Sequence, residues 1–394
     1  MTPVPFNLKW GIMATGGIAE MFTTDLLCAP SSRSVDDISH QLVAVASSGS
    51  AEKCDRFLKA IKAPNPDSVK KYASYAQLVA DADVEIVYVA TPHSHHFQNC
   101  MLALEAGKHV LCEKALTVNV AQARKLFETA KAKNLFFMEA VWTRFFPLSI
   151  KVRELLAAGE IGDVYRTIAD LSSNDHAENG KDLKFADNHR MVDLNLAGGA
   201  ILDLGVYPLT WLFQTLYHIQ PESIKESPRV VASSNLYRTG ADDNTVIVCQ
   251  FPGHRTMGVA TTSMRVDTDP VGQCSNANPS VRIQGSRGEI QVMGTAYQPS
   301  QIKIIKNKAV QVLDFPIPSD PAREDRGRGM FWEADECARC LRDGKLESGG
   351  MPWQESVAVM EVMEEALRQG GVAYPALITT DVYDAKSPLN VGNQ

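Results

Sequence analysis

Between Leu8 and about Ala140, short apolar runs alternate with stretches of helical periodicity, and this alternation restricts the fold more than any other feature of the chain. The runs are apolar throughout, as expected of parallel strands that are buried on both faces. Alternating strands and helices of this kind form a doubly wound parallel sheet. The predicted strands are Lys9–Ala14, Gln41–Ser47, Glu85–Thr91, His109–Glu113 and Leu135–Ala140, with helices at Phe97–Ala106 and Val120–Lys133.

The pattern changes after Phe145. A helix over Leu148–Ala158, a strand over Val164–Leu171 and a long apolar helix from near Ala200 to Tyr217 are predicted next. Consecutive strands with short turns then indicate an open, mostly antiparallel sheet with its helices on one face. These strands are Val230–Leu236, Thr245–Phe251, Thr256–Met264, Val281–Gln284, Glu289–Met293, Ile302–Lys306 and Val310–Phe315, and amphipathic helices follow at Phe331–Leu341 and Trp353–Gln369.

A chain of 394 residues exceeds what one hydrophobic core usually serves, so we predict two domains. Residues 1–145 form an α/β domain with a parallel sheet, and residues 146–394 form an α+β domain with the open sheet. The open face carries valines such as Val246, Val248 and Val259. Since an apolar face is not left in water, we expect a homodimer that buries it.

The turn after the first strand carries the sequence Ala14-Thr15-Gly16-Gly17-Ile18-Ala19, which matches the spacing GxGxxA with alanine in place of the first glycine. At such a turn the backbone approaches a pyrophosphate closely, and the helix N-terminus offers its free N–H groups to the anion. The position at the first strand of a βαβ series predicts a Rossmann dinucleotide site. Its expected contacts are Ala14, Thr15, Gly16, Gly17 and Ile18.

The end of the second predicted strand indicates which dinucleotide binds. An acidic residue there would accept hydrogen bonds from the ribose of NAD, but the chain has Ser47 and Ser48, with Lys53 following. Hydroxyls and a cation suit the 2′-phosphate of NADP. The alternative is a polar loop whose Lys53 and Arg56 face water.

Two further strand ends, Ala90 to His96 and Cys112 to Ala115, point toward the same edge of the sheet, where ligands bind in this architecture. Lys114 follows an apolar strand and so enters a partly desolvated crevice. In the second domain, Asp203 and Tyr207 are four residues apart and share one face of an apolar helix. A buried Asp needs a partner, and Lys114 is an attractive one. The alternative is that Asp203 caps the helix and Tyr207 packs in the core.

Three histidines, His93, His95 and His96, suggest a metal site, but no companion Cys or carboxylate set has ligand spacing. We therefore expect no metal, and assign polar contacts to the cofactor and a helix cap here. The pair Cys337 and Cys340 has CxxC spacing inside a predicted helix, whereas a redox pair would begin one.

Across essentially the whole chain, the sequence resembles the glucose-fructose oxidoreductase, inositol dehydrogenase and rhizopine catabolism family. The resemblance is carried by residues 9–19, 88–96, 112–115, 139–145 and 198–207. Within this family it is similar to the dimeric dihydrodiol dehydrogenase branch and to fungal NADP-dependent D-xylose 1-dehydrogenases. Ala115 replaces the proline of the family's Glu-Lys-Pro element, which leaves the local backbone less constrained.

The resemblance implies proton transfer by Lys114 and Tyr207, oriented by Asp203, with the formal base left open. It also implies cofactor contacts by Thr91, Pro92, His93, His96, Glu113 and Lys114. The implied reaction oxidises C1 of an aldopyranose, most simply D-xylose, to its lactone, with hydride transfer to NADP. Lys114 would favour the tyrosinate form of Tyr207.

Trp142, Arg144 and Phe145 follow the last strand of the first domain and, with Tyr207, could wall the sugar site. Packing at the domain junction is the alternative for the first three. The same scaffold would also suit a trans-dihydrodiol or dicarbonyl substrate. A non-catalytic NADP-sensing regulator is a rival of another class, but intact Lys114, Asp203 and Tyr207 argue against it.

Composition limits the partners. The net charge of −7 disfavours nucleic acid and anionic membranes, because both bind basic surfaces. No secretory leader and no segment long enough for a membrane span are predicted. The eight cysteines are scattered without a disulfide framework and are expected to be reduced thiols. These features favour a cytoplasmic enzyme that acts on a small molecule.

Overall fold

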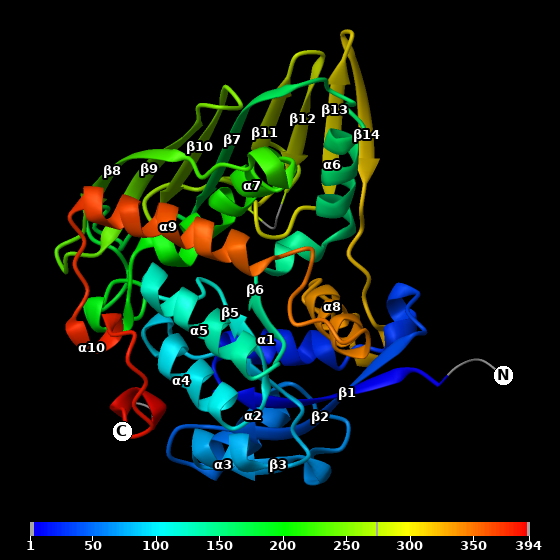
Figure 1. The fold of residues 1–394 in the computed structure, drawn as a ribbon, viewed down its shortest axis with the longest axis vertical. Coiled ribbons are helices and arrows are strands. Elements are labelled where there is room, and N and C mark those ends of the chain that lie inside the picture. Colours follow the sequence, from blue (N-terminus) through cyan, green and yellow to red (C-terminus); the bar gives the residue numbers. More distant parts are fainter. Residues whose placement is uncertain (1–3, 273–274, 392–394) are drawn as a thin grey trace.

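Two β-sheets with covering helices make up the structure, which a computed structural model describes for residues 4–272 and 275–391 (Figure 1). One sheet lies among the N-terminal elements and the other is the broad sheet at the opposite end of the molecule in Figure 1. Cys274, one of the expected thiols, lies outside the described residues. The seven described cysteines are free and buried.

The N-terminal sheet has six parallel strands in the order β3-β2-β1-β4-β5-β6. Its strands are β1 (Phe6–Met13), β2 (Ile38–Ala46), β3 (Lys70–Tyr72), β4 (Ile86–Val89), β5 (His109–Glu113) and β6 (Phe137–Ala140). The predicted parallel sheet is therefore confirmed. The prediction missed β3 because this edge strand has three residues, two of them lysines, and so lacks an apolar run.

Five helices connect these strands: α1 (Gly17–Leu26), α2 (Ala51–Ala60), α3 (Tyr75–Ala80), α4 (His93–Glu105) and α5 (Val120–Ala132). Helix α4 begins four residues before the predicted start at Phe97, because its histidine-rich first turn is buried rather than in solvent. The strand order reverses between β1 and β4. In open α/β sheets, ligands bind in the crevice at this switch point.

The second sheet has eight strands in the order β14-β13-β12-β11-β7-β10-β9-β8. Strand β7 (Val164–Ser172) pairs in parallel with β10, and the other described pairs of this sheet are antiparallel, which confirms the mostly antiparallel α+β prediction. The remaining strands are β8 (Arg229–Leu236), β9 (Asp242–Phe251), β10 (Thr256–Ser263), β11 (Pro279–Gly285), β12 (Gly288–Met293), β13 (Gln301–Lys306) and β14 (Ala309–Asp314).

Helices α7 (Val206–Leu216) and α9 (Trp353–Gly370) pack on one face of this sheet, and α6 (Pro147–Ala157) packs against α7. A π-helical turn, Ile201–Gly205, leads directly into α7. The stretch Leu194–Leu216 is long and apolar enough to cross a membrane by length and composition, contrary to the expectation from sequence. Most of it is buried inside the protein, where α7 packs on β7 and β10.

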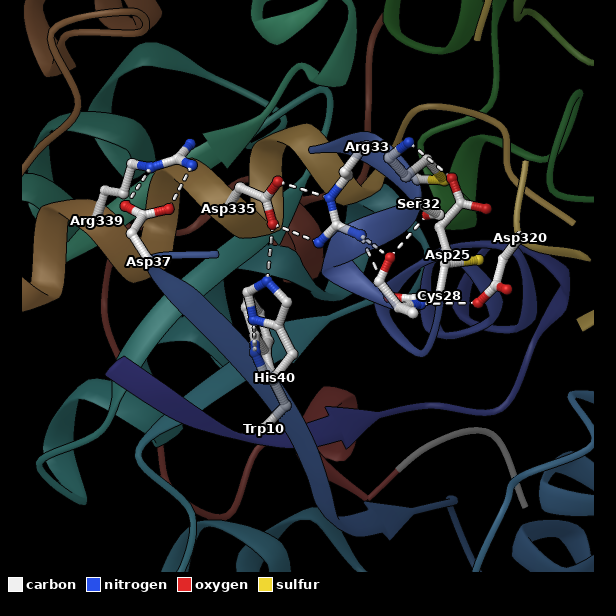
Figure 2. A network of polar contacts seen from close by, with 12 residues as sticks. Trp10, Asp25, Cys28, Ser32, Arg33, Asp37, His40, Asp320, Asp335 and Arg339 are labelled. Carbon is white, nitrogen blue, oxygen red and sulfur yellow. Dashed lines mark hydrogen bonds and ion pairs between the residues drawn. The ribbon is translucent and has the colours of Figure 1, made fainter. Parts of the chain in front are cut away.

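Helix α8 (Phe331–Arg342) packs beside α1 on β1 and β2, although it follows Ala46, the last residue of β2, by about 280 residues. Figure 2 shows the polar contacts that fasten it there. Arg33 forms a bidentate pair with Asp335 of α8 at 2.7 and 2.8 Å, and both side chains are almost fully buried. His40 of β2 contacts the same carboxylate at 3.0 Å.

The segment before α8 is also fixed to α1. The Asp25 carboxylate accepts hydrogen bonds from the backbone N–H groups of Arg328 and Met330 at 2.9 and 2.8 Å. At the end of the chain, the backbone around α10 (Ala376–Thr379) accepts two hydrogen bonds from Gln122 of α5. C-terminal segments thus complete the cover of the N-terminal sheet, while the proposed boundary between residues 145 and 146 stays a prediction.

Candidate active site

A cavity of about 890 Å³ opens at the carboxyl ends of β1, β4 and β5, facing the start of α7. The residues predicted from sequence that line it are Ala14, Gly16, Gly17, Ile18, Thr91, Pro92, His93, Glu113, Lys114, Trp142, Asp203 and Tyr207. This volume is in the range of small-molecule and cofactor sites. The structure therefore brings the two strand ends and the Asp-Tyr helix to one place.

The N-terminus of α1 borders this cavity and has no side-chain cap. A Cβ atom added to Gly16 or Gly17 would meet no protein atom within 4 Å, so packing within the protein does not demand glycine there. The open space leaves the first-turn N–H groups accessible to an anion. Ala14, which stands where the motif has glycine, adopts a φ of +88°, a conformation that glycine takes without strain.

Two further groups suit a bound dinucleotide. The Thr91 hydroxyl is buried in the cavity wall and has no hydrogen-bond partner among the described residues. Arg328 lines the cavity from the segment that Asp25 fixes to α1, and its guanidinium makes no ion pair within the described parts of the chain. Sequence reasoning missed Arg328, because it lies in an irregular segment without periodicity or motif. The residues present therefore fit a nicotinamide dinucleotide.

The predicted catalytic residues are in contact. Lys114 Nζ donates to the backbone carbonyl of Asp203 at 2.8 Å and lies 3.3 Å from its carboxylate. The same Nζ is 5.1 Å from the centroid of the Tyr207 ring. Trp142 Nε1 donates to the Tyr207 hydroxyl at 2.8 Å. This arrangement aims an ammonium group and a phenolic hydroxyl at the same cavity.

Asp203 has a second cationic neighbour that sequence reasoning missed. Arg190 Nη1 lies 3.0 Å from the Asp203 carboxylate and also lines the cavity. Burial alone would raise the pKa of Asp203, but Lys114 and Arg190 outweigh it and hold this pKa well below its usual value. Arg190 belongs to the long irregular segment after β7, so no pattern linked it to Asp203. The ionised Asp203 thus anchors Lys114.

Tyr207 does not fit the expectation that Lys114 favours its ionised form. Burial and the nearby Glu113 carboxyl raise the pKa of Tyr207 well above its ordinary value, despite the hydrogen bond that Trp142 donates. The Tyr207 hydroxyl therefore holds its proton, and it is suited to donating or relaying a proton rather than resting as tyrosinate. The lysine nevertheless lies over the ring, as the resemblance implies.

Several predicted contacts do not line the cavity. Thr15 follows Ala14 at its rim, whereas Ser47, Ser48 and Lys53 lie at the end of β2 and the start of α2. Ser47 is buried and its hydroxyl donates to the Ser50 carbonyl, and Lys53 contacts the Ser48 carbonyl at 3.4 Å. Their cofactor role stays a prediction.

Arg144 and Phe145 lie in the interior rather than in the cavity wall. Arg144 is fully buried, forms an ion pair with Glu355 of α9, and donates to the Gly350 carbonyl at 2.9 Å. Phe145 packs beneath Gly350. Both therefore have the packing role that was the alternative to substrate contact, and of the three residues only Trp142 lines the cavity.

The three histidines have separate environments. His93 lines the cavity, and burial lowers its pKa to about 3. His95 contacts the Ser94 hydroxyl at 2.8 Å. His96 has no exposed surface and does not line the cavity, because its ring lies among backbone carbonyls behind the Lys114 turn. His96 therefore does not line the cavity from which the predicted cofactor contact would be made, and its ring contacts the backbone of Thr91, Ala115 and Leu116 instead.

A doubly wound sheet with an uncapped glycine turn, joined to a Lys-Asp-Tyr cluster at its switch point, defines a dinucleotide-dependent oxidoreductase. Residues 8–141 match the family described as "Oxidoreductase family, NAD-binding Rossmann fold", and residues 149–291 match the "GFO/IDH/MocA C-terminal domain". The chain belongs to the GFO/IDH/MocA family.

Individual relatives agree with this assignment. The chain is 68% identical over 391 residues to D-xylose 1-dehydrogenase (NADP(+)) of Hypocrea jecorina, with 99% of each chain covered. It is 35% identical to trans-1,2-dihydrobenzene-1,2-diol dehydrogenase of Bos taurus, over 93% of this chain and 98% of that protein. The solved aldose-aldose oxidoreductase of Caulobacter crescentus shares the fold, with a TM-score of 0.72 at 20% identity over 93% of this chain and 98% of that one.

Proposed function

We propose that the protein is an NADP-dependent sugar 1-dehydrogenase that oxidises the anomeric carbon of D-xylose to the lactone. The observation that carries this proposal is the 68% identity to an NADP-dependent D-xylose 1-dehydrogenase across nearly the full length of both chains. The contact of Lys114 with Asp203 and Tyr207 in the cavity supports it, since these groups can handle the proton of a sugar hydroxyl.

NADP, when bound, would supply the acceptor for the hydride that leaves C1. The residues of the chain perform the rest of the reaction. The backbone carbonyl and the carboxylate of Asp203 accept hydrogen bonds from two of the three N–H groups of the Lys114 ammonium. The third N–H is left to bind the C1 hydroxyl of the sugar. The positive charge stabilises the alkoxide that develops as the hydroxyl proton leaves. Tyr207, whose hydroxyl oxygen accepts a hydrogen bond from Trp142, takes up that proton as its own phenolic proton passes to water in the open cavity.

Residues around the cavity divide the binding of the cofactor and the sugar. The α1 N-terminus and Arg328 would hold the pyrophosphate, and Thr91, Pro92, His93 and Glu113 would contact the nicotinamide half. Ser47, Ser48 and Lys53 would bind the 2′-phosphate. Trp142 and Tyr207 provide the aromatic wall for the sugar. No carboxylate stands at the tip of β2, which supports a preference for NADP over NAD.

A panel of aldoses tests the proposal, with NADP and NAD reduction followed by absorbance and the product identified by mass spectrometry. We expect D-xylose to give the highest kcat/KM and to yield a lactone, with NADP strongly preferred. Equal efficiency with NAD would contradict the cofactor assignment. Higher efficiency with a trans-dihydrodiol would favour the second candidate, which the 35% identity to a dihydrodiol dehydrogenase supports. A complete lack of turnover would favour a regulator.

We propose that two copies of the chain form a homodimer through the open face of the eight-stranded sheet. We also propose that the protein is cytoplasmic. Val231, Val248, Val259 and Ile168 face one another across four neighbouring strands of this sheet, on the face away from α7 and α9. Val231 is 66% exposed. The reduced cysteines and the negative charge fit a cytoplasmic protein with no nucleic acid or membrane partner.

A further inference from the structure

We propose that His96 is a positioning residue that carries a positive charge at neutral pH, and that this imidazolium ties the end of β4 to the turn that presents Lys114. The inference deepens the proposed function and rests on it for the kinetic arm of its test. The charge state itself can be measured without any turnover.

The contacts of the ring carry the proposal. His96 Nδ1 lies 2.9 Å from the Ala115 carbonyl and 3.1 Å from the Leu116 carbonyl, and Nε2 lies 2.8 Å from the Thr91 carbonyl. Carbonyl oxygens only accept hydrogen bonds, so both ring nitrogens face acceptors. A neutral imidazole has one N–H and one lone pair. The lone pair would be directed at a carbonyl oxygen, whereas an imidazolium satisfies both sides.

The surroundings decide whether a charge can stay there. The ring has no exposed surface, and burying an unpaired charge is costly. Burial lowers the pKa of His96, whereas the Cys112 sulfur beside the ring and the hydrogen bonds to the carbonyls of Thr91 and Ala115 raise it, and the net shift is upward. The carbonyl dipoles thus replace the solvent that the charge has lost.

The other titratable groups near the ring come from the two elements packed against it. On α4, burial lowers the pKa of His93 to about 3 and that of His95 to about 4, so both are neutral. On β5, burial raises the pKa of the Cys112 thiol, while the neighbouring His96 lowers it, so the two groups favour each other's charged forms. The Glu113 carboxyl, also on β5, accepts a hydrogen bond from the Tyr88 hydroxyl. Of the three histidines in this turn, His96 is therefore the one in which we expect a charge.

The position of the contacts explains the effect on catalysis. Thr91 borders the cavity at the end of β4, and Ala115 directly follows Lys114 at the end of β5. The lysine itself is held by Asp203 across the cavity. Fixing the backbone on the near side therefore sets the distance between Lys114 Nζ and the C1 hydroxyl. A misplacement of about 1 Å in a reacting group can cost about a hundredfold in rate.

The charge state is tested by NMR of full-length protein labelled with ¹⁵N in its histidine rings. At pH 8, where ordinary histidines are neutral, His96 is expected to show the imidazolium pattern, in which both nitrogens carry a proton. The signal is assigned by its loss in His96→Gln. Should that variant not fold, the wild type and His218→Gln are compared, and the imidazolium must persist in both. A neutral pattern for His96, or no imidazolium at all, overturns the proposal.

The kinetic arm uses His95→Gln as a matched control, since His95 is buried in the same turn but its ring forms a hydrogen bond only with Ser94 among the described residues. His96→Gln is expected to lower kcat for D-xylose about a hundredfold, with little change in the Kd of NADP. His95→Gln should keep most of its activity. A kcat within about threefold of wild type in a folded His96→Gln overturns the positioning role. If wild type oxidises no sugar, the proposed function fails while the NMR result stands.

Discussion

Asp203 is the residue on which the geometry of the site depends. It lies between Lys114 and Arg190, and its backbone carbonyl as well as its carboxylate contacts the lysine. A π-helical turn holds Asp203, and Tyr207 follows in the first turn of α7. The helix therefore places both groups, so that the anchor of Lys114 and the Tyr207 hydroxyl share one rigid element.

We predict that Lys114→Met leaves folding and NADP binding largely intact, because the proposed pyrophosphate site is at Gly16 and Gly17. The kcat for D-xylose should fall by about a hundredfold to ten-thousandfold, as expected for the loss of a preorganised cation. Tyr207→Phe should be similarly damaging, and the double variant little worse than either, because groups that act as a unit are not additive.

Steady-state kinetics and fluorescence titration of NADP measure these effects, with the exposed Lys125→Met as a control for loss of a surface charge. If Lys114→Met keeps more than about a tenth of wild-type kcat, the proton-handling role is wrong. The lysine would then be a structural or cofactor contact.

The charge on His96 should make the free energy of unfolding depend on pH. The pKa of His96 is raised to about 9 in the folded protein, against about 6.5 when unfolded. Its charge therefore contributes stability that is fully present below about pH 6.5 and is lost as the pH rises through about 9. The difference in free energy of unfolding between wild type and His96→Gln, measured in urea, should shrink over that interval. A difference that grows with pH would contradict the assignment.

At the scale of elements, the spacing of apolar residues along the chain predicted most of the secondary structure. The strand His109–Glu113 has the predicted ends, and helix α5 ends one residue early. The failures have physical causes. Strand β3 is too short and polar to show a pattern, and the first turn of α4 is polar in sequence but buried by the Lys114 turn and the loop at Ala197.

The site was predicted where a motif or strand end marked it, as at Gly16 and Lys114. Residues that reach the site only through tertiary contacts were not predicted. Arg190 and Arg328 come from irregular segments, and only the folded chain brings them to the cavity. Conversely, Arg144 was predicted to wall the sugar site by its place after β6, but a buried carboxylate on α9 holds it inside.

The buried ion pair between Arg33 and Asp335 attaches α8 to the first domain, and we predict that breaking it destabilises the protein (Figure 2). In Asp335→Asn the buried Arg33 loses its counter-charge, and breaking such a pair from one side costs about 3–5 kcal/mol. The matched control is Glu365→Gln, whose partner Arg368 is 71% exposed, so that its loss costs at most about 1 kcal/mol. Urea unfolding compares the two variants. A cost for Asp335→Asn as small as the control's would show that packing alone holds α8.

At the scale of the whole molecule, we predict that the open face of the larger sheet is the dimer interface. Replacing Val248 by Asp places a charge at the centre of the row formed by Val231, Val248 and Val259. Wild type should be a dimer by light scattering at micromolar concentration, and Val248→Asp a folded monomer, because a desolvated charge without a partner opposes association. Val382→Asp, exposed on the C-terminal segment, is the control and should stay dimeric. A monomeric wild type would refute the dimer.

The return of α8 to the first sheet also has a consequence for synthesis. The ribosome makes β1, β2 and α1 first, but the helix that covers them appears about two hundred residues after residue 145. At about 5–20 residues per second, the uncovered sheet waits roughly ten to forty seconds. During that time Arg33 and His40 have no carboxylate partner, and apolar side chains of the sheet remain open to other proteins. The nascent chain should therefore need a chaperone in this interval, and a fragment ending near residue 145 should aggregate when it is expressed alone.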